Sequence, residues 1–72
     1  KELKMYLTGN VGEETILTLV TLQGYALFQR NVQQTTAQQY EVLDVRNLPL
    51  GVYILKAVRS DKVKTFRIIR AE

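Results

Sequence analysis

Cysteine and histidine are both absent from this sequence of 72 residues. Without cysteine the chain can form neither a disulfide nor a thiolate metal site, and the usual clue to the redox compartment is missing. Without histidine it also lacks the commonest acid–base group, a frequent metal ligand and the imidazole of serine and cysteine nucleophile arrangements. We therefore expect no metal, no cofactor and no enzymatic activity.

The remaining polar residues form no catalytic pattern either. Ser60 is the only serine and lies in an expected turn, where its side chain more simply shapes the backbone. Glu13 and Glu14 are adjacent, so their side chains point to opposite faces of an extended chain. Glu41 and Asp44 are three positions apart and therefore also point to opposite faces. No residue is predicted to be catalytic, cofactor-binding or metal-binding.

Long hydrophobic runs are missing as well. The longest apolar run, residues 52–55, is four residues long, far short of the ~20 that a membrane-spanning helix needs. The sequence begins at Lys1 without an initiator methionine and without the charged, apolar and small-residue succession of a signal peptide. We expect residues 1–72 to form a single domain of a longer protein.

Positive charge is concentrated near the end of the sequence. The net charge is +3. Residues 56–72 contain six basic and two acidic residues, a balance of +4, whereas residues 1–55 contain four basic and five acidic residues. Such a patch could meet an anionic surface. It is more simply explained as the solvated side of a terminal strand that discourages edge pairing.

Short apolar and threonine-rich segments alternate with turn residues at nearly regular intervals, which is typical of an all-β protein. The expected strands are residues 3–7, 14–22, 25–32, 40–45, 51–60 and 62–70. A single sheet this small would leave a whole apolar face exposed. The sequence therefore predicts an antiparallel β-sandwich of six or seven strands.

Three of the turns between these strands carry structural predictions. Gly24 allows a tight reversal between 14–22 and 25–32, and residues 14–22 have apolar groups on both faces, as in a central strand. Pro49 and Gly51 must interrupt any strand that precedes 51–60, because proline lacks an amide hydrogen. The turn before 62–70 is either two residues or slightly longer.

Residues 33–39, "QQTTAQQ", are polar and low in complexity, without glycine or proline. They are either the tip of a hairpin or the frayed ends of two strands. A helix over 33–43 is a further alternative.

Basic β domains can bind single-stranded nucleic acid by stacking bases on aromatic side chains. No two aromatic residues occupy positions i and i+2 of one expected strand. The tyrosines and phenylalanines are scattered singly, as expected for core packing. We predict no nucleic-acid partner.

Three segments together resemble a known family. In "LVTLQGYALF" (19–28), Gly24 occupies the glycine of a characteristic turn, although Tyr25 replaces its customary arginine. "VLDVRNLPLGVYILKAV" (42–58) carries Leu48, Pro49, Gly51 and Tyr53 in the register Leu-Pro-x-Gly-x-Tyr. "KVKTFRIIR" (62–70) has the basic and aliphatic character of a terminal strand.

In this order, the three segments resemble the C-terminal sorting domain of the type IX secretion system, also called the Por secretion system C-terminal domain. The resemblance implies an immunoglobulin-like sandwich at the C-terminus of a larger secreted protein. It implies a sorting signal that the secretion translocon and surface sortase components recognise. The parent would cross the periplasm and reach the outer-membrane surface or the outside, where some cargo is attached to anionic lipopolysaccharide.

By position, the resemblance implies a set of partner-recognition residues: Gly51, Tyr53, Lys62, Lys64, Arg67 and Arg70. Gly24 and Pro49 would be structural turn residues. Two other functions stay open, a non-catalytic structural or adhesive sandwich module and a retained domain of a surface secretion component. Free strand edges leave a homodimer by strand pairing or exchange open as well.

Overall fold

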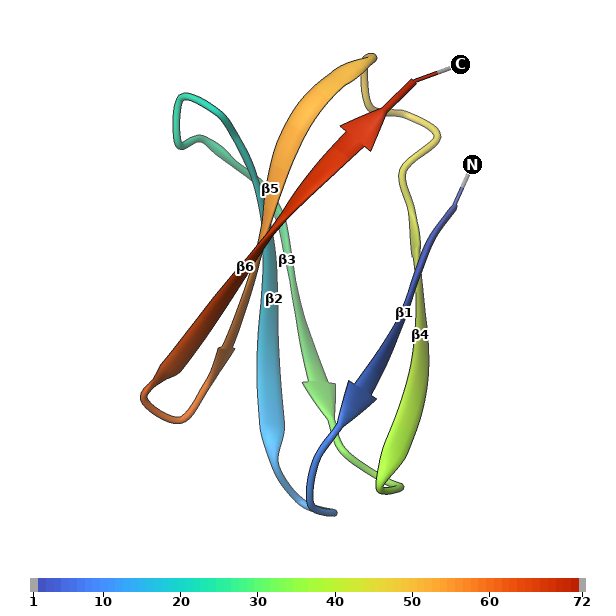
Figure 1. Ribbon diagram of the computed structural model, residues 1–72, viewed down its shortest axis with the longest axis vertical. Helices are drawn as coiled ribbons and strands as arrows, with labels where there is room; N and C mark the ends of the chain where they lie inside the picture. Colours follow the sequence, from blue (N-terminus) through green and yellow to red (C-terminus); the bar gives the residue numbers. More distant parts are fainter. Residues whose placement is uncertain (1, 72) are drawn as a thin grey trace.

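The structure is a computed structural model that describes residues 2–71, and this part of the chain folds into six β-strands with no helix. The strands are β1 (Glu2–Thr8), β2 (Glu14–Thr21), β3 (Ala26–Gln33), β4 (Gln38–Asp44), β5 (Gly51–Arg59) and β6 (Lys62–Arg70). They form two antiparallel sheets, a pair β1-β4 and a four-stranded sheet in the order β3-β2-β5-β6 (Figure 1). The predicted all-β, antiparallel two-sheet class is confirmed, and the immunoglobulin-like assignment stays a prediction.

Strand β2 lies inside the four-stranded sheet, as its two apolar faces predicted. Leu17 and Leu19 point between the sheets and are 0% exposed. Ile16 and Thr18 point the other way and are half-buried. Gly24 has a φ of +97° in the β2–β3 turn, a value that glycine adopts at no steric cost.

For residues 33–39 the predicted hairpin tip and the helix over 33–43 are wrong, and the interpretation as strand ends holds only for Gln33, Gln38 and Gln39. Strand β3 ends at Gln33 and β4 starts at Gln38. The two strands lie in different sheets, so the segment between them is a crossover and not a hairpin tip. The crossover is fixed by side-chain amides, since Gln39 accepts hydrogen bonds from the amide and hydroxyl of Thr35 at 2.7 and 2.9 Å.

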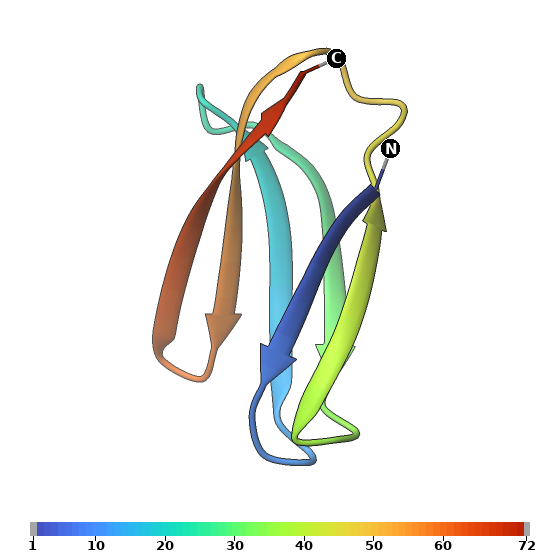
Figure 2. The same ribbon diagram turned by 45° about the vertical axis from the view of Figure 1, so that its right-hand side comes forward.

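The core lies between the two sheets (Figure 2). Its buried cluster consists of Leu17, Leu19, Val32, Leu43, Tyr53 and Leu55. Only Leu43 of this cluster belongs to the β1-β4 pair, which also contributes half-buried side chains from β1. Burying these apolar surfaces is the main force that holds the small sheet on the large one.

Candidate functional site

Strands β5 and β6 form a long hairpin at the end of the described chain. All nine residues of each strand pair, from Gly51 opposite Arg70 to Arg59 opposite Lys62. Only Ser60 and Asp61 connect the strands, so the shorter of the two predicted turns is correct. Ser60 adopts a φ of +54°, the sign that the first residue of a two-residue hairpin turn requires.

The loop before this hairpin, residues 45–50, is held by side chains of both strands. The hydroxyl of Tyr53, a residue only 7% exposed, donates to the carbonyl of Pro49. Arg70 donates from Nε to the Leu48 carbonyl at 2.7 Å and from Nη2 to the Arg46 carbonyl at 3.1 Å. Proline at this position removes a backbone donor, and the two side chains satisfy the neighbouring carbonyls.

Gly51 joins this loop to β5 with a φ of +152°. L-residues with a side chain rarely adopt this value, whereas glycine does so readily. The Leu-Pro-x-Gly-x-Tyr segment therefore sets the direction in which β5, and through it β6, leaves the loop.

An ion pair between Asp44 and Arg46 lies where β4 leads into the same loop. The guanidinium of Arg46 donates to both carboxylate oxygens of Asp44, at 3.0 Å from Nε to Oδ1 and 2.8 Å from Nη2 to Oδ2. These hydrogen bonds, together with one from the Arg46 amide, lower the pKa of Asp44 to about 2. The pair is exposed, so it orders the start of the loop locally and adds little to global stability.

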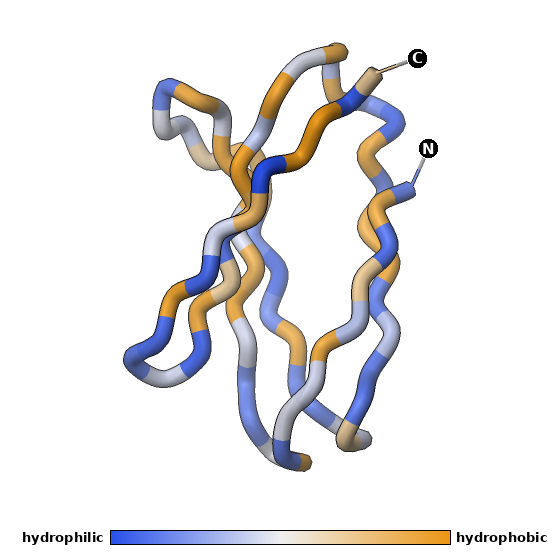
Figure 3. Tube along the Cα trace, in the orientation of Figure 1, coloured by the Kyte–Doolittle hydropathy of each residue, from blue (hydrophilic) through white to orange (hydrophobic). Residues whose placement is uncertain are grey.

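The six predicted recognition residues fall into two groups. Gly51, Tyr53 and Arg70 lie together at one end of the hairpin and contact or form the loop. Lys62 and Lys64 lie exposed near the opposite end, and Arg67 is exposed in the middle of β6. Basic residues at positions 62, 64, 67 and 70 separate the hydrophobic residues along β6 (Figure 3).

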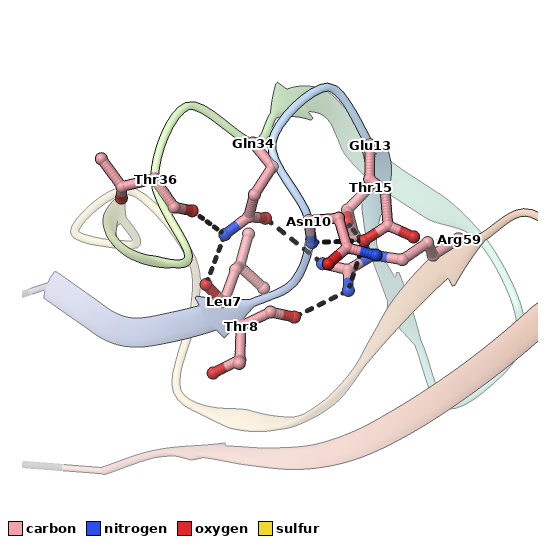
Figure 4. Close-up of polar contacts among 8 residues, drawn as sticks. All are labelled: Leu7, Thr8, Asn10, Glu13, Thr15, Gln34, Thr36 and Arg59. Carbon is pink, nitrogen blue, oxygen red and sulfur yellow. Dashed lines mark hydrogen bonds and ion pairs between the residues drawn. The ribbon is translucent and has the colours of Figure 1, made fainter.

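Arg59 was missed as an organising residue of this hairpin. Its Nε donates to Thr15 Oγ1 at 3.0 Å, and its Nη1 donates to the Thr8 carbonyl at 2.7 Å (Figure 4). Its Nη2 lies 3.4 Å from Gln34 Oε1, and its Nη1 lies 3.6 Å from Glu13 Oε1. We call Thr8, Glu13, Thr15, Gln34 and Arg59 the Arg59 cluster. It ties the end of β5 to β1, β2 and the crossover after β3.

Gln34 is 1% exposed, and its polar groups are satisfied within the protein. Its Nε2 donates to the carbonyls of Leu7 and Thr36 at 2.7 and 2.9 Å. A buried amide left without partners would be costly, so these bonds fix where the crossover passes. Gly9 leaves room for the cluster, since a Cβ there would lie 2.6 Å from Arg59 Nη1.

Within residues 2–71 no group of three or more histidine, cysteine, aspartate or glutamate residues is placed to hold a metal ion. The same residues contain no helix that is long and apolar enough to cross a membrane.

Comparison with known proteins gives one match. A family model described as the secretion system C-terminal sorting domain matches residues 2–71. No curated protein and no solved structure gives a significant match. The match covers every strand of the fold, including the loop and hairpin described above.

Proposed function

The chain belongs to the family of type IX secretion C-terminal sorting domains. We propose that the secretion translocon binds the folded domain and that the domain thereby directs export of its parent protein across the outer membrane. The family supports a sorting signal for type IX secretion, export to the outer membrane or cell surface, and interaction with the type IX machinery. The parent would be a larger secreted protein that carries this domain at its C-terminus.

In this proposal the two groups of residues have different roles. Gly51, Tyr53 and Arg70 hold the loop and present the last hairpin, while Lys62, Lys64 and Arg67 dock on the machinery. A surface sortase would then act on the domain, and the parent would become attached to anionic lipopolysaccharide. The domain itself would perform no catalysis.

The observation that supports docking most is that three cations on β6 are exposed and form no ion pair within residues 2–71. Lys62, Lys64 and Arg67 are exposed on an edge strand. Within residues 2–71 the ion pairs are made by Arg30, Arg46 and Arg59, and none involves these three side chains. No internal ion pair has to break before these cations contact a partner, and they can steer an acidic surface towards the domain.

Export of a reporter tests the proposal. Residues 1–72 are fused behind a signal-bearing reporter in a bacterium with type IX secretion, and surface reporter is compared with periplasmic reporter. We expect surface display from the intact fusion and retention in the periplasm after removal of residues 65–72. Export of the truncated fusion at the same efficiency would contradict a docking role for β6.

Charge variants avoid the folding problem that truncation brings. Lys64→Gln should reduce surface reporter, whereas Lys56→Gln removes one exposed positive charge from the opposite face of the same hairpin and should not. Circular dichroism confirms that both variants are folded. Equal losses in the two variants would show that only net charge matters.

A structural or adhesive module remains the competing function, and a terminal tag separates it from a sorting signal. An adhesive sandwich should tolerate a bulky tag after Glu72, because its function does not use that end of the chain. A sorting signal that presents β6 should lose export with the same tag. Unchanged export of the tagged fusion would contradict a need for a free end after β6, whereas absence of export from both the tagged and the untagged fusion would favour the adhesive module.

A further inference from the structure

The two lateral openings between the sheets differ in the contacts that cover them. On the side of β3 and β4, Arg30 reaches from β3 and donates from Nη1 to the Val42 carbonyl of β4 at 3.1 Å. The same guanidinium pairs with Glu41 at 3.1 Å between Nη2 and Oε1. A side chain of the large sheet therefore covers the edge of the small sheet on this side.

On the opposite side, β6 is the edge strand of the large sheet, and it pairs with β5 and not with β1 (Figure 2). A cavity of about 660 Å³ lies near the end of β1, and its walls include Leu7, Thr8, Lys62, Lys64 and Phe66. A second cavity of about 140 Å³ lies near the start of β1, with walls that include Glu2, Leu3, Ile68 and Arg70. We call the space formed by the two cavities the β1–β6 seam.

The backbone of β1 offers an unused edge to this seam. Successive residues of a strand direct their amide and carbonyl groups to alternate edges. The carbonyl of Leu7 meets Gln34 of the crossover that leads into β4, whereas the carbonyl of Thr8 meets Arg59 of β5. By this alternation the backbone groups of Lys4 and Tyr6 face the seam, where no strand of residues 2–71 pairs with β1.

The opposite wall of the seam has a defined chemical pattern. Residues 62, 64, 66, 68 and 70 share the inner face of β6, which reads Lys, Lys, Phe, Ile, Arg. Phe66 is 48% exposed although it lies beside buried Leu55. The β6 face is thus apolar at its middle and basic at the hairpin end. The cavity there is also lined by Asp61 and by Glu13, which pairs with Arg59, so Lys62 and Lys64 are the cations left to favour an acidic ligand.

We propose that the β1–β6 seam binds an extended segment of a partner protein, which adds to β1 as a third strand. Backbone hydrogen bonds to β1 would supply affinity, as in other cases of strand addition to a free edge. An apolar centre of the segment would cover Phe66, and acidic residues at one of its ends would meet Lys62 and Lys64. This inference rests on the proposed function, because it names the surface by which the machinery would read the domain.

A synthetic peptide tests the seam directly. The probe is a fluorescein-labelled peptide about as long as a typical strand, with alternating valine and threonine and two glutamates at each end. Fluorescence anisotropy against residues 1–72 should show saturable binding, and the amides of Lys4 and Tyr6 should gain protection from hydrogen exchange. A peptide with lysine in place of glutamate should bind much more weakly.

Three variants locate the binding. Lys62→Glu/Lys64→Glu should weaken binding at least about tenfold, as expected when favourable charge pairs become repulsive. Lys4→Pro removes one donor from the seam edge and should also weaken binding. Lys56→Glu is the matched control, since Lys56 is exposed on the opposite face of the same sheet and its change should leave affinity within about twofold.

Several outcomes would overturn the proposal. These are absence of binding, an equal effect of Lys56→Glu, protection of other amides in place of Lys4 and Tyr6, or occupation of the seam by a second copy, seen as a dimer in light scattering. The export assay is independent of these measurements. Export without peptide binding would contradict the proposed binding site in the seam and support the sorting signal. Peptide binding without export would support the binding site and contradict the sorting signal.

Discussion

At the scale of single residues, Arg59 does more to define the structure than any cation predicted to bind a partner. Its guanidinium donates to Thr15 and to the Thr8 carbonyl, and Gln34 and Glu13 lie within polar contact. One side chain thereby satisfies groups from four segments of the chain. A planar group with five donors can do this, whereas an ammonium cannot reproduce the geometry.

Replacing Arg59 should therefore destabilise the fold. We expect Arg59→Met to lower the free energy of unfolding by about 2 kcal/mol, because it removes charge-assisted hydrogen bonds and leaves part-buried acceptors unsatisfied. Urea denaturation followed by circular dichroism measures the change. Arg67→Met is the control, since Arg67 is exposed and should change stability by less than about 0.5 kcal/mol. Equal effects of the two changes would contradict the role of the cluster.

The sequence held a signal for Arg59 but none for Gln34. Alternation in 51–59 places Arg59 on the same face as Tyr53, Leu55 and Ala57, so an inward arginine at the strand end could have been predicted. Gln34 lies in a run of similar polar residues, and nothing local distinguishes the buried glutamine from the exposed Gln33 beside it. Its burial is set by tertiary contacts with Leu7 and Arg59. Neither the alternation of polar and apolar residues nor the composition of the segment reveals these contacts.

At the scale of elements, alternation and turn residues were sufficient to place all six strands to within two residues of their observed ends. Most strands are bounded by local signals such as Gly24 or Pro49, which act whatever the tertiary context, whereas the polar run between β3 and β4 has none. Strand pairing is different, because the partners in β1 and β4 are separated by 30 positions of sequence, for Thr8 and Gln38, up to 42, for Glu2 and Asp44. No turn specifies that register, so it emerges only from packing of the two sheets.

The β6 strand and the loop before β5 also act together as a unit. Arg70 connects them through the carbonyls of Leu48 and Arg46. We expect Arg70→Met to loosen the loop and to speed hydrogen exchange of the Leu48 amide, which donates to Val45, by about tenfold, equivalent to about 1.4 kcal/mol of local stability. Arg67→Met removes an arginine from the same strand and should leave this exchange unchanged. Similar exchange rates in both variants would mean that Arg70 does not anchor the loop.

At the scale of the whole molecule, the domain has little stability in reserve. A chain of this size seldom gains more than about 3–5 kcal/mol from its core, and without cysteine it has no disulfide to add. The small sheet contributes one residue, Leu43, to the buried cluster. Association of the two sheets therefore depends on few side chains, and the open β1–β6 seam leaves apolar surface of β6 uncovered.

Leu43→Ala should accordingly separate the sheets and unfold much of the population. Truncating a buried leucine costs about 2–5 kcal/mol, which is as large as the expected stability of the domain. The neighbouring Val42 is only half-buried and faces the opposite side of β4, so Val42→Ala should leave the domain folded. Thermal unfolding of both variants measures the difference. If the sorting signal must be folded to be read, reporter export should fail for Leu43→Ala and persist for Val42→Ala. Export of an unfolded Leu43→Ala domain would show instead that the machinery reads β6 as a linear segment.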